Sequence, residues 1–151
     1  MKLLKEDFND ILKNQRIKPV FQPIVSLTDG KIIGYEALSR IVKPKEIKAS
    51  EELFFLAGLY GKIWELEQLC RGKILETYHV LDSEKNEQKL FLNVNPMVIH
   101  DSQFHIGFTS QYLKQYKLKD ERYYYRKSIR KRNHCDAGCR YCCVYHGKEG
   151  L

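Results

Sequence analysis

The sequence lacks any long apolar run: none approaches the roughly 20 residues that a membrane-spanning helix needs. Its start, MKLLKEDFNDILKNQR, is amphipathic and too acidic for a secretory signal. The first 120 residues contain one cysteine, Cys70, and neither an internal repeat nor a low-complexity segment. These absences predict a cytoplasmic globular protein with reduced thiols and no membrane partner.

Charge is the next feature, because the chain of 151 residues has a formal net charge of +7. The excess of Lys and Arg lies mainly after residue 120, together with four of the five cysteines. A basic protein often binds nucleic acid. Since the basicity belongs to the last segment, we expect no nucleic-acid partner for the main domain.

The pattern along the first 120 residues alternates between helix and strand. Helical spacing of apolar residues predicts a helix over 4–15, and runs rich in β-branched and aromatic residues predict strands over 18–27, 31–41 and 89–95. The turn Thr28-Asp-Gly-Lys31 should join the first two strands as a hairpin. Pro96 should end the third strand, because it has no N–H to donate, and a helix is expected over 101–117.

Two more helices are predicted between the second and third strands. Ser50, followed by two glutamates, has the pattern of a helix start. Gly58 and Gly61 should bracket a break before a longer helix. One face of that helix collects apolar residues at a period near 3.6: Ile63, Leu66, Cys70, Ile74, Tyr78 and Leu81.

Helices that alternate with strands predict an α/β fold of parallel β/α units. A complete barrel of that kind takes roughly 250 residues, and this alternation stops near residue 120. We therefore expect an incomplete TIM-like barrel over 1–120, followed by a basic, Cys- and Tyr-rich, disordered tail over 121–151. Half a barrel leaves an open strand edge and should be unstable alone unless it self-associates.

Three polar residues in the predicted strands could carry chemistry. Glu36 lies in an apolar strand and Asn95 at the carboxyl end of another, where active-site residues of β/α barrels gather. Their oxygens are hard ligands for Mg²⁺ or Mn²⁺, and Arg40 could grip a phosphate. Each also has an ordinary explanation: a solvated strand Glu, an Asn that begins a turn before Pro, and a surface Arg.

Three motifs in order along the chain resemble the EAL-domain family. They are Phe21-Gln-Pro-Ile-Val-Ser-Leu27, Gly34-Tyr-Glu-Ala-Leu-Ser-Arg40 and Leu90-Phe-Leu-Asn-Val-Asn-Pro96. The resemblance covers roughly residues 16–120, the first half of that family's barrel. It implies a cyclic di-GMP phosphodiesterase, which hydrolyses cyclic di-GMP to pGpG with two Mg²⁺ or Mn²⁺ ions, and it is compatible with a homodimer.

The resemblance also implies roles for single residues. Glu36 would be the catalytic and metal-binding Glu of the family's name, and Asn95 would be a second metal ligand. Arg40 would contact a ligand phosphate, and Gln22 and Leu38 would contact the nucleotide.

The family's later motifs do not follow in this sequence: a strand-terminal Glu, a paired-Asp motif, a Lys and a further Glu. Two side chains cannot complete two metal sites, since each ion needs about six oxygen ligands. The resemblance therefore implies a truncated, inactive phosphodiesterase domain. The alternative is a degenerate, non-catalytic module that binds cyclic di-GMP or a protein.

The segment Arg122-Tyr-Tyr-Tyr-Arg-Lys127 suggests a reason for the departure. With suitable codons, a shift of one base would make it encode Asp-Ile-Ile-Ile-Glu, the kind of strand that the family has at this place. We therefore hypothesise a frameshift near residue 121, which the DNA sequence across residues 118–151 tests. In the tail, Cys135, Cys139 and Cys142 have a spacing seen in radical S-adenosylmethionine enzymes, and a zinc site is chemically conceivable. Out-of-frame translation explains the same residues without a metal.

Overall fold

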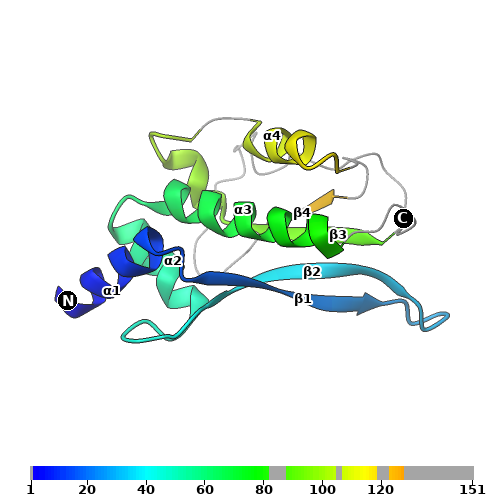
Figure 1. Ribbon diagram of the computed structural model, residues 1–151, viewed down its shortest axis with the longest axis horizontal. Helices are drawn as coiled ribbons and strands as arrows, with labels where there is room; N and C mark the ends of the chain where they lie inside the picture. The colour runs from blue at the N-terminus through cyan, green and yellow to red at the C-terminus, as the bar shows by residue number, and fades with distance from the viewer. Residues whose placement is uncertain (1, 82–87, 105–106, 119–122, 128–151) are drawn as a thin grey trace, which may run out of the picture.

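The fold was described from a computed structural model over residues 2–81, 88–104, 107–118 and 123–127. These residues form helices and strands in a mixed α/β order (Figure 1). In chain order they are α1 (Lys2–Lys13), β1 (Ile17–Val25), β2 (Ile32–Ile41), α2 (Ser50–Leu59), α3 (Ile63–Leu81), β3 (Lys89–Val94), the 3₁₀ helix η1 (Pro96–His100), α4 (Phe108–Gln115) and β4 (Tyr123–Lys127).

The first two strands form the predicted hairpin. β1 and β2 pair antiparallel from Ile17 opposite Ile41 outward, with an irregularity at Ile24 and Val25 near the turn. Gly30 has a φ of 70°, a left-handed conformation that glycine adopts without steric cost. The hairpin prediction is confirmed, with strand ends within two residues of those expected.

The remaining strands are parallel, as the alternation of helix and strand predicted. The sheet order is β1-β2-β3-β4, with β2 parallel to β3 and β3 parallel to β4. The connection from β2 to β3 passes through α2 and α3, and the connection from β3 to β4 passes through η1 and α4. Helix α3 lies along one face of the sheet, with α4 beside it (Figure 1).

The apolar core lies between this helical layer and the sheet. One buried cluster joins Ala37, Leu90 and Leu92 of the strands to Ile74 and Leu75 of α3. Burial of such side chains stabilises the fold by about 25 cal/mol per Å² of apolar surface removed from water. A second cluster joins α1 and α2 to the first turns of α3, and it includes Phe8, Ile11, Leu53 and Leu66.

The long helix α3 confirms most of the predicted apolar face. Leu66, Cys70, Ile74 and Tyr78 are buried, but Leu81 at the helix end is 62% exposed. The period of 3.6 fixes the direction in which a side chain points, but it does not tell where the packing partner ends. The predicted break before α3 is confirmed, with Gly61 at a φ of 63°.

Two predicted helices differ in detail from the structure. α2 begins at Ser50, as predicted, but Ser50 does not cap it: Ala49 precedes the helix without a side-chain cap, and the Ser50 hydroxyl donates to the Ser39 carbonyl at 2.6 Å. The helix expected over 101–117 is shorter, because α4 begins at Phe108 after Gly107, whose φ is 95°. The preceding turn of helix, η1, instead begins at Pro96, which lacks a backbone donor and suits a first helical position.

The sheet continues beyond the predicted boundary at residue 120. β4 pairs in parallel with β3, from Tyr123 beside Leu90 to Lys127 beside Val94. Tyr is a good strand former, so the three consecutive tyrosines suit this place. The division at residue 120, the disordered tail and its cysteines lie largely outside the described residues and stay predictions.

None of the helices in the described ranges is long and apolar enough to cross a bilayer.

Candidate functional site

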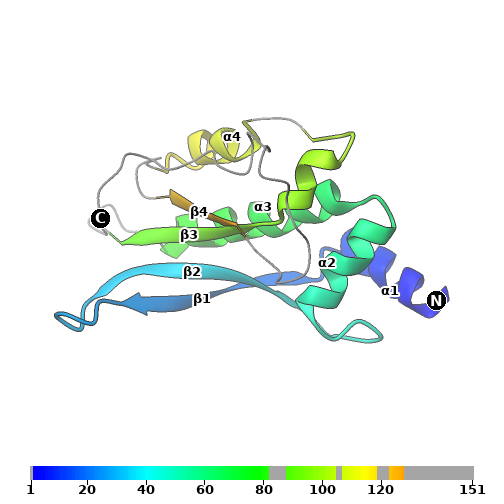
Figure 2. The same cartoon turned by 180° about the vertical axis from the view of Figure 1, so that it is seen from behind.

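The candidate site lies on the face of the sheet that points away from α3. Strand alternation places Tyr35, Ala37 and Leu92 toward the helices, where they belong to the buried cluster or pack against it. The intervening residues, Glu36 among them, therefore point to the opposite face. In Figure 2 β3 and β4 lie in front of α3, and the hairpin of β1 and β2 continues the sheet below them.

The predicted residues Gln22, Glu36, Leu38 and Arg40 share this face. Gln22 is directly opposite Glu36 in the antiparallel pair of β1 and β2, and Leu38 and Arg40 follow Glu36 at intervals of two. Leu38 is half-buried, whereas Gln22 and Arg40 are exposed. The guanidinium of Arg40 donates to the neighbouring Ser39 carbonyl at 3.2 Å and remains open to solvent. One open face thus presents an amide, a carboxylate, an apolar side chain and a cation.

The residue that the structure brings to Glu36 is Asn93. Its side-chain amide nitrogen donates to Glu36 Oε1 at 2.8 Å. The parallel register explains the contact, because Phe91 lies beside Glu36 and Asn93 follows two residues later on the same face. The alternation of Phe91, Asn93 and Asn95 along the third strand places both asparagines on this face in the sequence, and the register of β2 and β3 brings Asn93 to Glu36.

Asn95 has a different role in the described contacts. It follows the last residue of β3, and its side-chain oxygen accepts the N–H of Met97 at 3.0 Å, so it caps η1. The ordinary explanation of this residue, an Asn that begins a turn before Pro, therefore agrees with the structure. Its predicted service as a metal ligand stays a prediction.

Behind the carboxyl end of β3 lies a buried ion pair on α3. Glu67 Oε2 accepts from the Arg71 guanidinium at 2.7 Å, and Glu67 Oε1 accepts the backbone N–H of Asn95 at 2.8 Å. Arg71 also donates to the Thr109 hydroxyl at 2.9 Å, at the start of α4. Burial raises the pKa of the Glu67 carboxyl, and the Arg71 charge opposes that rise. Sequence patterns did not indicate this pair.

The donors on the open face fit part of a site for a hard divalent cation. A carboxylate and a carboxamide in contact offer the oxygen ligands that Mg²⁺ and Mn²⁺ prefer. Over the described ranges, no group of three or more His, Cys, Asp or Glu side chains gathers at one point. Glu36 and Asn93 thus supply a fraction of the roughly six ligands that such an ion takes.

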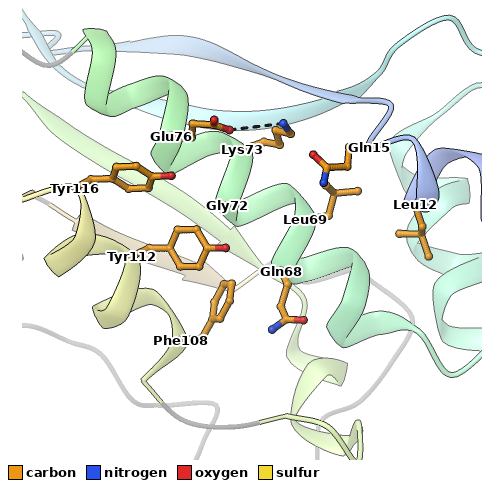
Figure 3. Close-up of a pocket in the computed structure, with 10 residues that line it drawn as sticks. All are labelled: Leu12, Gln15, Gln68, Leu69, Gly72, Lys73, Glu76, Phe108, Tyr112 and Tyr116. Carbon is orange, nitrogen blue, oxygen red and sulfur yellow. Dashed lines mark ion pairs between the residues drawn. The ribbon is translucent and has the colours of Figure 1, made fainter.

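A separate hollow of about 450 Å³ lies on the helical side of the molecule (Figure 3). It is lined by α3 residues that include Gln68 and Gly72, and by the aromatic rings of Phe108, Tyr112 and Tyr116. Figure 3 shows the rings of Phe108 and Tyr112 on α4, and that of Tyr116 just after its end, across from α3. Because no strand residue lines the hollow, it is not part of the site around Glu36.

Comparison with solved structures finds the same fold in several proteins. PaMucR phosphodiesterase in a c-di-GMP complex aligns with a TM-score of 0.68 and 20% identity over 83% of this chain and 51% of that one. The FimX EAL domain of Xanthomonas citri, in complex with c-diGMP, gives 0.67 and 16% over 83% and 49%. The Bacillus subtilis YkuI protein, in complex with c-di-GMP and calcium, gives 0.61 and 25% over 80% and 30%.

The chain therefore spans about half the length of the first two structures that it matches. The comparison with curated proteins finds no match. The family described as "EAL domain" matches residues 5–123, which is most of the chain and includes all three motifs. The shared fold, the incomplete β/α barrel and this match lead to one conclusion: the chain belongs to the EAL domain family.

Proposed function

We propose that the chain forms the nucleotide-facing part of an EAL-type domain and binds cyclic di-GMP across the open face of its sheet. The observation that carries the proposal is the contact of 2.8 Å between Glu36 and Asn93 on that face. Gln22 lies opposite Glu36, and the exposed Arg40 lies four residues farther along β2. The PaMucR, FimX and YkuI structures are complexes with c-di-GMP, which supports the choice of nucleotide.

The chemistry of the face suits a cyclic dinucleotide. Each phosphodiester carries one negative charge and two free oxygens, which the planar guanidinium of Arg40 can bind as a fork. Gln22 offers both a donor and an acceptor to a base or a ribose hydroxyl. Leu38, half-buried between Glu36 and Arg40, offers an apolar contact.

A divalent cation would be held by Glu36 and by the side-chain oxygen of Asn93. Asn95 is the second candidate for the amide ligand. It ranks after Asn93 because its side-chain oxygen already accepts one hydrogen bond from Met97. When bound, Mg²⁺ or Mn²⁺ would activate a water molecule and stabilise charge on the leaving oxygen of a phosphodiester. With the ion bound, the Glu36 carboxylate would point toward the carboxyl end of β3. It already points in this direction in its contact with Asn93.

Hydrolysis to pGpG needs more ligands than this face supplies over the described residues. We therefore propose nucleotide binding without turnover for this chain, in a domain type that includes the PaMucR phosphodiesterase. Of the two functions that the sequence suggested, this proposal favours the non-catalytic module that binds cyclic di-GMP.

The proposal is tested by isothermal titration of the whole chain with cyclic di-GMP in the presence of Mg²⁺ or Mn²⁺. Wild-type protein should bind, and Arg40→Ala should weaken binding by roughly ten- to a hundredfold, since a hydrogen bond to a charged group contributes about 1.5–3 kcal/mol. Glu36→Gln should weaken the dependence of binding on the cation. Chromatography of the same mixtures should detect no pGpG.

Lys31→Ala is the matched control, because Lys31 is an exposed cation at the hairpin turn, paired with Asp29 at 3.4 Å. It should leave the affinity unchanged. Equal affinities for Arg40→Ala and wild type, or no binding by a folded wild-type protein, would contradict the proposed nucleotide site. Release of pGpG would show that turnover needs fewer ligands than we propose.

A further inference from the structure

We infer that Glu67 is a positioning residue, whose buried carboxylate fixes the carboxyl end of β3 and thereby holds Asn93 against Glu36. Glu67 lies on α3, on the far side of the sheet from the open face, and touches neither Glu36 nor Asn93 in the described contacts. The inference rests on the proposed function only where it takes the pair of Glu36 and Asn93 as a ligand site.

A direct contact joins helix α3 to the end of β3. Glu67 Oε1 accepts the N–H of Asn95 at 2.8 Å, two residues after Asn93 and directly after the last residue of β3. A buried carboxylate binds such a donor more strongly than a neutral acceptor does. On the β2 side the strand ladder ends at Leu92, and on the β4 side it ends at Val94, so a side chain of α3 takes over directly after the last ladder pair and fixes the exit of the chain from β3.

Glu67 itself is immobile. Its side chain is 4% exposed, and its other oxygen is bound by Arg71 at 2.7 Å. Arg71 in turn donates to Thr109 and lies 5.7 Å from the centre of the Phe108 ring, so it joins α3 to α4. Both oxygens of Glu67 are thus used, and the carboxylate has little freedom to turn.

The same segment has a second anchor. After η1, Asp101 accepts the backbone N–H of Trp64 at the start of α3, at 2.9 Å. The segment 95–101 is therefore held to α3 at both ends, by Glu67 and by Asp101. Because both ends of this segment are bonded to α3, the position of α3 fixes the end of β3, where Asn93 lies.

A pair of double variants separates this role from simple stability. In Glu67→Gln with Arg71→Met, the amide oxygen can still accept from Asn95, and no unpaired buried cation remains. In Glu67→Leu with Arg71→Met, the residue at position 67 is of similar size but has no acceptor. The two proteins differ only in the group that faces the Asn95 N–H.

The measurement is the ¹H–¹⁵N spectrum of the whole chain, in which the side-chain amide of Asn93 is identified by its loss in Asn93→Ser. We expect Glu67→Gln with Arg71→Met to keep the Asn93 amide at its wild-type shift. We expect Glu67→Leu with Arg71→Met to move it toward the value of a solvated amide and to speed its exchange with water. Equal Asn93 signals in the two double variants would overturn the inference.

Asp7→Asn is a control for global loosening. Asp7 is a second buried carboxylate that is paired with an arginine, Arg16 at 2.9 Å, and it accepts the backbone N–H groups of Glu46 and Ile47. It should lower the melting temperature without moving the Asn93 signal. If Asp7→Asn moved the Asn93 signal as far as Glu67→Leu with Arg71→Met does, the effect of Glu67 would be one of general stability. That result would overturn the inference.

Addition of Mn²⁺ to the wild-type sample then tests the proposed function separately. A cation held by Glu36 and Asn93 should broaden the Asn93 signal before other signals, because paramagnetic relaxation falls steeply with distance. In the leucine variant, the Mn²⁺ concentration needed should rise by about ten- to a hundredfold, as for other residues that orient metal ligands. If Mn²⁺ broadens nothing selectively, the cation site fails while the comparison of double variants still decides the role of Glu67.

Discussion

At the scale of single residues, the chemistry of this chain depends on where ionisable groups are buried. Glu67, Cys70 and Arg71 follow one another on the buried side of α3. Glu67 and Arg71 satisfy each other, whereas at Cys70 the cost of burying a thiolate outweighs the favourable effects of Ser39 and Arg71. The same helix thus holds a fixed ion pair and an unreactive thiol.

Burial raises the pKa of the Cys70 thiol from an ordinary 9.0 to about 12. The folded protein should therefore contain about a thousandfold less thiolate at this position than an ordinary cysteine, and the thiolate is the nucleophile. We expect Cys70 to resist iodoacetamide at pH 8 and to react quickly in urea. Mass spectrometry of the peptide that contains Cys70 measures both rates, and similar rates in the two conditions would contradict the prediction.

Asp10 should make stability depend on pH in the acid range. Hydrogen bonds from Lys45, Arg16 and Asn14 lower the pKa of Asp10 from 3.8 to about 2. A lowered folded-state pKa gives stabilisation that is present above pH 3.8 and is lost as the pH falls toward about 2.

The measurement for Asp10 is the urea midpoint at several pH values, for wild type and for Asp10→Asn. The two midpoints should differ at pH 5 and converge as the pH approaches about 2. A difference that does not change with pH would show that the ion pairs of Asp10 contribute nothing to the folded state.

Asn93 and Asn95 show what a sequence can tell about a site. Both asparagines have the parity that faces Glu36, so alternation along the strand could not choose between them. The choice depends on register between β2 and β3 and on the point where the strand ends, which are properties of two segments far apart in sequence. The residues on β1 and β2 were easier, since the hairpin fixes their register locally.

At the scale of elements, the sequence predicted the features that depend on single residues, such as turns and helix breaks. The hairpin turn at Gly30 and the break at Gly61 follow from backbone conformations that single residues favour. A side-chain cap of α2 could not be judged in this way, because the Ser50 hydroxyl bonds to Ser39, a partner on another element. β4 was also missed, since its tyrosines became a strand only through pairing with β3.

Among the glycines of the described residues, Gly34 is the one at which an added Cβ would lie nearest to another atom. A Cβ there would lie 2.4 Å from the Lys89 carbonyl oxygen and 3.0 Å from the Phe91 ring. Gly34→Ala should therefore lower the free energy of unfolding by about 1–3 kcal/mol through overpacking against a backbone atom.

Gly58→Ala is the matched control on a helix. A Cβ there would meet only Ile63 Cδ1 at 3.7 Å, an ordinary contact, so the change should stabilise α2 by up to about 1 kcal/mol. Urea unfolding of the two variants measures the difference. A neutral effect at Gly34 would mean that the two strands can separate without loss.

At the scale of the whole molecule, the described chain is a sheet covered on one face. Helix α3 packs on the side of Ala37, Leu90 and Leu92, while Glu36 points to the other side of the sheet. Apolar side chains are also exposed at the free end of the hairpin: Val25, Leu27, Ile32 and Ile33. Exposed apolar surface of this kind favours association, so the homodimer expected from the sequence remains our prediction.

Sedimentation velocity should detect this self-association. We expect the sedimentation coefficient to rise with protein concentration, and Leu27→Lys with Ile33→Lys to lower it at a given concentration. Leu59→Lys is a control, since Leu59 is 64% exposed on α2, outside the hairpin. A single concentration-independent species of monomer mass would contradict the prediction.

The position of β2 has a consequence for cation choice. Its backbone is bonded to β1 on one edge and to β3 on the other, and its inner side chains pack beneath α3. The strand that carries Glu36 therefore cannot shift to widen or narrow the space above it, so only rotation of the side chain remains. Since rigid oxygen sites discriminate ions by radius, selectivity between small and large alkaline-earth ions would be set by this framework rather than by ligand type.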